Sequence, residues 1–103
     1  MKNYIYDEKF KNDDIFRQNF LSKAIDSLIN DDLMGCKRVL REYFHNARCW
    51  TVIGKMVNKY PNNLHSLLKE GSNPTVKNLL PVIKALQDNE NIKIKTYLAP
   101  KDI

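Results

Sequence analysis

The 103-residue sequence contains little of what marks several classes of protein. Its three glycines are too few for a turn-rich β fold. Its two cysteines, Cys36 and Cys49, are spaced neither as a zinc ribbon nor as a CxxC redox pair. No apolar run approaches the roughly 20 residues that cross a membrane, and residues 2–8 lack the apolar stretch of a signal peptide. We therefore expect a cytoplasmic protein with reduced thiols and no membrane partner.

Signals of catalysis and of cofactor binding are missing too. His45 and His65 belong to no metal-ligand spacing, and the sequence has no glycine-rich loop that would cradle a phosphate. The two Asp pairs, at residues 13–14 and 31–32, precede predicted helices, where they would accept hydrogen bonds from free backbone N–H groups. The sequence predicts no enzymatic activity, no cofactor and no metal site.

The sequence does contain enough apolar residues for one domain, together with an uneven distribution of charge. A chain of 103 residues, 43% of them hydrophobic, supports a single core. Residues 1–32 carry five Lys or Arg against seven Asp or Glu, whereas residues 33–87 carry nine against two, a net charge of +7. A basic central block on a small domain indicates a polyanionic partner.

Apolar residues recur with the period of a helix through most of the chain. Residues near 14–29 form a first amphipathic helix, whose apolar stripe consists of Phe16, Phe20, Ala24 and Leu28. A second helix is predicted near 32–46, with Leu33, Cys36, Leu40, Tyr43 and Phe44 on one stripe.

Three shorter apolar segments follow. Trp50, Ile53 and Met56 predict a third helix of about nine residues. Pro61 ends that stretch and suits the first position of a fourth helix, which ends near Glu70. The last helix is predicted over about 75–88. Because Pro81 is unfavourable inside a helix, either Thr75 caps a kinked helix or Asn78 caps a later start.

Residues 92–98 alternate between apolar and polar side chains, the pattern of a β-strand. A lone strand needs a partner, which could be residues 3–6, a second copy of the chain or another protein. The sequence thus divides into an N-terminal segment at 1–13, a helical domain at 14–88 and a strand or tail at 89–103.

The third and fourth predicted helices are short and are joined by a four-residue break, as a helix-turn-helix at about 50–70 requires. In that motif the second helix enters the major groove of DNA. Apart from its leucines the second helix here is polar, and it has no acidic residue before Glu70.

This region resembles the helix-turn-helix of the addiction-module antidote (antitoxin) proteins, members of the lambda-repressor-like superfamily. The most specific similarity is LHSLLKEGSNPT at residues 64–75, followed by LLPVIKAL at residues 79–86. Upstream, Ala24, Leu28 and the Leu40-Arg41 pair are similar to the paired N-terminal helices of the family. The resemblance covers about residues 16–98. It implies an all-α fold, a five-helix lambda-repressor-like DNA-binding domain with a short C-terminal strand.

Several positions depart from the family pattern. Gly54 replaces an alanine, which we expect to be tolerated, and Asn58 stands at the turn glycine. Lys59 takes a position that is normally apolar, and Tyr60 stands at the usual serine cap. We expect Tyr60 to supply the missing apolar contact.

The resemblance also assigns candidate contacts with DNA at the matched positions. The side chains that would read bases are Asn62, His65, Ser66 and Lys69. Those that would meet phosphates are Thr51, Lys55, Lys59 and Asn73. Trp50 is expected in the core, the alternative being an edge that contacts a phosphate.

These observations lead to an expected function with one alternative. We expect a helix-turn-helix transcriptional regulator that binds operator DNA as a homodimer, acting as the antitoxin of a toxin-antitoxin module with a cognate toxin protein as partner. The alternative is a module of the same fold that binds a toxin, or a host or phage factor, without binding DNA specifically.

Overall fold

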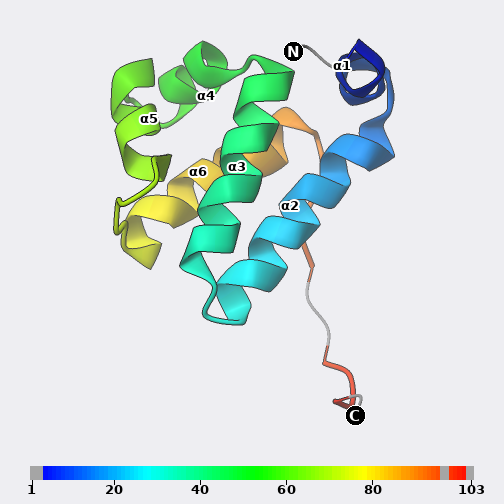
Figure 1. The fold of residues 1–103 in the computed structure, drawn as a ribbon, viewed down its shortest axis with the longest axis vertical. Coiled ribbons are helices and arrows are strands. Elements are labelled where there is room, and N and C mark those ends of the chain that lie inside the picture. The colour runs from blue at the N-terminus through cyan, green and yellow to red at the C-terminus, as the bar shows by residue number, and fades with distance from the viewer. Residues whose placement is uncertain (1–3, 96–97, 102–103) are drawn as a thin grey trace.

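The computed structural model of the chain describes residues 4–95 and 98–101, with residues 4–7 as backbone only. Within these residues it contains six helices and no strand, which confirms the all-α class (Figure 1). The helices are α1 (Tyr4–Asn12), α2 (Asp14–Ile29), α3 (Leu33–Ala47), α4 (Trp50–Met56), α5 (Pro61–Leu68) and α6 (Val76–Asn89).

Short polar side chains fix where three of these helices begin. Asp13 Oδ1 accepts a hydrogen bond from the backbone N–H of Phe16 at 3.0 Å, and Asp32 Oδ1 accepts from that of Gly35 at 2.9 Å. Thr75 Oγ1 accepts from the backbone N–H of Asn78 at 3.2 Å. Each bond satisfies an N–H group that has no partner within its helix.

The cap at Thr75 decides between the two predicted starts of the last helix. Helix α6 begins directly after Thr75 and continues through Pro81. Pro81 lies on the exposed face, with Leu79 and Val82 buried on either side of it. The carbonyl group that loses its intrahelical partner at Pro81 belongs to Lys77, an exposed residue, so water can replace the bond.

The core lies where α3 packs between α2 and the remaining helices. Helices α2 and α3 lie side by side as an antiparallel hairpin, and α6 crosses behind α3 (Figure 1). Helix α3 contributes Cys36, Leu40, Tyr43 and Phe44 to the core, each fully buried. Burial raises the pKa of the Cys36 thiol and raises that of Cys49 to about 12, so both cysteines are inert as nucleophiles at neutral pH.

Residues 4–12, predicted from the sequence as part of an N-terminal segment, are helical and pack on the rest of the bundle. Residues 4–12 form α1, so the prediction that residues 3–6 pair as a strand is wrong for 4–6, while Asn3 lies outside the described residues. The anchor of α1 is Phe10, which is fully buried with its ring centroid 4.9 Å from that of Phe20 and 5.4 Å from that of Tyr43. This single aromatic anchor creates no periodic pattern.

The predicted strand at 92–98 is likewise absent from the described residues. Residues 92–95 and 98 are irregular, and residues 96–97 lie outside the described part. The alternation has a different cause: Ile92 packs against the core and Ile94 is half-buried, whereas Lys93 and Lys95 are exposed. The backbone N–H of Ile94 donates to Gln87 Oε1 at 2.7 Å, which holds the tail on α6.

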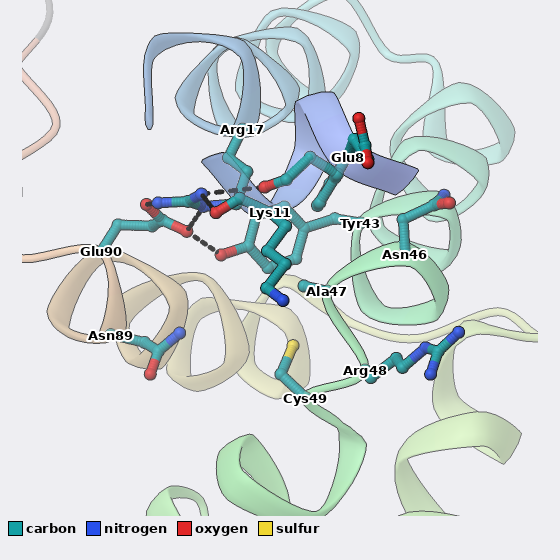
Figure 2. A pocket seen from close by; sticks show the side chains of 11 residues that line it. Glu8, Lys11, Arg17, Tyr43, Asn46, Ala47, Arg48, Cys49, Asn89 and Glu90 are labelled. Atoms are coloured by element: carbon teal, nitrogen blue, oxygen red, sulfur yellow. Dashed lines mark hydrogen bonds and ion pairs between the residues drawn. The ribbon is translucent and has the colours of Figure 1, made fainter. Parts of the chain in front are cut away.

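A buried polar cluster joins the ends of four helices (Figure 2). Arg17 Nε on α2 lies 2.8 Å from Glu90 Oε2, at the end of α6, and its Nη1 donates to the carbonyl of Phe10 at 2.8 Å. The hydroxyl of Tyr43, on α3, donates to the same Glu90 oxygen. The side chain of Glu90 is only 4% exposed. Its hydrogen bond with Arg17 raises the pKa of Arg17, and burial, followed by the bond with Glu90, raises that of Tyr43.

We predict that E90A lowers the free energy of unfolding by about 3 kcal/mol, because the Tyr43 hydroxyl loses the acceptor to which it donates and the Arg17 guanidinium loses its buried carboxylate partner, keeping only its bonds to Asp14 and to α1 carbonyls. The matched control is D88A, which removes an exposed pair with Lys84 on the same helix and should change stability by less than about 0.5 kcal/mol. Urea unfolding measures both. Equal effects of the two substitutions would contradict the role given to Glu90.

Candidate nucleic-acid interface

Helices α4 and α5 form two short helices joined by a tight turn, and they lie together at one side of the bundle with α5 outermost (Figure 1). Four residues, 57–60, separate them. Asn58 adopts a left-handed backbone with φ of 61°, which asparagine tolerates better than most residues. Asn58 thus takes at this turn the left-handed conformation that glycine adopts most readily.

The turn closes directly against Gly54. The backbone N–H of Lys59 donates to the carbonyl of Gly54 at 2.8 Å. A Cβ atom added to Gly54 would lie 2.7 Å from the carbonyl oxygen of Lys59, closer than such atoms approach. Glycine therefore fits at position 54 and alanine does not, because the obstacle to a Cβ is backbone that the turn itself holds in place.

Tyr60 does not supply the apolar contact expected of it. Its side chain is 79% exposed, and its backbone is extended, with φ of −72° and ψ of 151°, at the start of α5. Leu64 packs beneath the turn instead, with Cδ1 3.7 Å from the position of a Cβ on Gly54. Tyr60 therefore starts α5 through its backbone, while Pro61 occupies the first helical position as predicted.

Three of the predicted base-reading residues, Asn62, His65 and Ser66, lie on α5, and the fourth, Lys69, directly follows its last residue with an extended backbone. Asn62, His65 and Ser66 follow one another at spacings of three residues and one residue, which places them on one helical face. All four are exposed, whereas Leu64 and Leu68, on the opposite face, are fully buried. The predicted phosphate contacts, Thr51, Lys55, Lys59 and Asn73, are exposed as well.

His65 is held in a stack of three rings. Its ring centroid lies 3.6 Å from that of Trp50, with 20° between the planes, and Trp50 stacks on Phe44 at 4.5 Å and 23°. Phe44 is fully buried, Trp50 is half-buried and packs against the core, and His65 is exposed. His65 is thus positioned by the core. The sequence pattern did not reveal this contact, because 15 residues separate the two rings.

The carboxyl end of α5 is held by cations from α3. Lys37 Nζ donates to the carbonyls of Lys69, at 3.2 Å, and of Ser72, and to Ser72 Oγ at 3.1 Å. Arg41 Nη1 donates to the carbonyl of Leu68 at 2.6 Å. These bonds satisfy carbonyl groups that a helix end leaves without partners.

This arrangement corrects the interpretation of the basic block. Lys37 is only 3% exposed, and Arg41 is half-buried with its guanidinium on Leu68, so neither is a freely solvated surface charge. The exposed basic residues along α4 and α5 are Arg48, Lys55, Lys59 and Lys69. No Asp or Glu occurs between Glu42 and Glu70. The α4–α5 unit therefore presents positive charge without interspersed negative charge.

A second feature is a cavity of about 750 Å³ where α1, α3 and α6 end. Its wall includes the buried Arg17, Tyr43 and Glu90, with Lys11 reaching into the opening (Figure 2). The carboxyl end of each of these helices carries partial negative charge. Arg17 is held there by Glu90 and the Phe10 carbonyl, and the exposed Lys11 and Arg48 lie where these helix ends favour a positive charge.

No group of three or more His, Cys, Asp or Glu side chains among the described residues could hold a metal ion. No described helix is both long enough and apolar enough to cross a membrane. Comparisons with protein-family models, curated proteins and solved structures find no match to this chain.

We predict that G54A lowers the free energy of unfolding by about 1 to 3 kcal/mol, although alanine is the better helix former, because the new methyl group displaces the backbone at Lys59. The control is T51A, at an exposed position of the same helix, with an expected change within about 0.5 kcal/mol. Thermal or urea unfolding distinguishes them. A stabilised G54A protein would show that the turn does not press on Gly54.

We predict that K37M lowers the free energy of unfolding by about 2 kcal/mol, because two carbonyls and a hydroxyl lose their buried donor. Hydrogen exchange at the end of α5 should rise with it. R38M, at the exposed neighbouring position, is the matched control and should leave both measurements nearly unchanged.

Proposed function

We propose that this protein is a helix-turn-helix DNA-binding regulator, in which α5 enters the major groove of a duplex operator. The observation that carries this proposal is the exposed stripe of Asn62, His65 and Ser66 on a short helix without acidic side chains, with the exposed Lys69 directly after its end. Base edges in the major groove offer the donors and acceptors that such side chains recognise. The α4–turn–α5 geometry supports the same assignment.

The proposed DNA contacts fall into two groups, those that read bases and those that meet phosphates. Asn62 and Ser66 lie on the outermost stripe of α5, where asparagine pairs with adenine through two hydrogen bonds and serine reads several edges. Lys55 and Lys59 supply positive charge beside that stripe, and Thr51 and Asn73 supply short polar groups. These four side chains would position the domain on phosphates without selecting a sequence.

One copy of α5 is too short to specify an operator alone. With eight residues it is about 12 Å long and can reach only a few base pairs of one groove. We therefore propose a homodimer that places two copies of α5 on half-sites one helical turn apart.

The proposed biological role is that of an antitoxin, with a cognate toxin protein as second partner. This step rests on the sequence resemblance to the addiction-module antidote proteins. The alternative, a protein-binding module without specific DNA binding, is favoured by Val52 and Met56, which are 51% and 46% exposed on α4 beside the lysines. Exposed apolar side chains suit a protein surface better than a phosphate backbone.

The test compares binding to the DNA upstream of the protein's own gene with binding to random duplex of equal length. We predict that N62A/S66A loses preference for the first DNA by roughly 10- to 100-fold, while its binding to random DNA changes little. K55Q/K59Q should weaken both alike and reduce the slope of log K against log salt by about 0.9 for each phosphate that the protein no longer neutralises.

K23Q on α2, exposed and away from α5, is the control for general loss of charge, and a much smaller effect is expected of it. Wild-type binding that disappears equally from both DNAs at physiological salt would overturn the proposal in favour of the protein-binding alternative.

A further inference from the structure

The chain has two histidines, and both lie at one hollow beside α5. This hollow has a volume of about 420 Å³ and is lined by Arg41, Glu42, His45, Asn46, Trp50 and His65. His45 reaches it from α3 and His65 from α5, and both are exposed. Histidine is the side chain whose ordinary pKa places its charge change between pH 5 and 8. Protonation of either histidine would therefore add positive charge at this one place.

The surroundings of the hollow favour an incoming anion once the histidines are charged. Helix α3 faces it with Arg41 and Glu42 besides His45, and α4 contributes Trp50, which does not titrate. Lys69, directly after the end of α5, follows His65 by four residues. Glu42 is the one acidic group among the lining residues. The Trp50 ring would stabilise a charged His65 through a cation–π contact.

We propose that His45 and His65 form a proton-dependent contact for a phosphodiester group of the nucleic acid, so that the affinity of the α4–α5 interface rises in mild acid. The inference rests on the proposed function and adds its regulation. Each protonated imidazole gains one positive charge and donates N–H hydrogen bonds to phosphate oxygen. A neutral imidazole carries no charge to neutralise the phosphate.

The change should appear in both affinity and salt dependence. Between pH 7.5 and pH 5.5 the dissociation constant for duplex DNA should fall about tenfold at moderate salt. The slope of log K against log salt should steepen by about 0.9 for each phosphate newly neutralised. The DNA phosphates stay ionised across this range, so the added charge comes from the protein.

The binding experiment uses the full chain and one duplex at both pH values, with wild type, H45Q, H65Q and the double variant. The double variant should lose the pH effect on affinity and on slope, and each single variant should lose part of it. K55Q is the matched control, because it should lower the slope equally at both pH values and keep the pH difference. A wild-type affinity and slope that do not change with pH would overturn the inference.

The fluorescence of Trp50 separates failure of this inference from failure of the proposed function. Trp50 is the sole tryptophan and stacks on His65, and a charged imidazole quenches indole emission. Wild type and H45Q should lose emission from pH 7.5 to 5.5, and H65Q should not. Wild-type emission that stays constant from pH 7.5 to 5.5 would show that the His65 ring stacked on Trp50 gains no charge, and would overturn the inference. A clear change of Trp50 emission with pH, together with no DNA binding at either pH even at low salt, would instead contradict the proposed function on which the inference rests.

Discussion

Every α-helix ends with carbonyl groups that have no partner inside the helix. This bundle depends on buried and half-buried cations that donate hydrogen bonds to those groups. Arg17 bonds to the end of α1, while Lys37 and Arg41 bond to α5 and the residues after it. The cations come from α2 and α3, the two longest helices. The long hairpin therefore fixes the positions of the shorter elements, including the helix that carries the candidate interface.

Local patterns were sufficient to predict five of the six described helices, because α2 to α6 each have an apolar stripe and three of them begin at a capping side chain. What the sequence could not show depends on contacts between distant residues. Helix α1 is held by Phe10 against Tyr43, 33 positions away. The tail alternates because Ile92 and Ile94 rest on the bundle, so its period of two reflects burial on one side and needs no partner strand.

The candidate interface was likewise predictable where it depends on local spacing, and not where it depends on contacts between distant residues. Helical spacing was enough to place Asn62, His65 and Ser66 on one exposed face of α5, since that follows from which leucines are buried. The count of basic residues predicted the charged surface less well than helical spacing predicted the exposed face. It does not distinguish Lys37, buried beneath α5, from Lys55 on the surface. Nor does helix propensity predict fit, because the Lys59 carbonyl lies too close to Gly54 for the Cβ of an alanine.

His65 stacks on Trp50 and also lies on the exposed stripe of α5. The two roles are compatible. A ring that stacks through one face keeps its nitrogen atoms at the edge, where they remain able to donate. Stacking also restricts the rotation of the side chain, so a bond formed at that edge loses less conformational entropy than one from a free surface histidine. The stack can therefore prepare His65 for binding, and its continuation through Trp50 to Phe44 connects that edge to the rigid core.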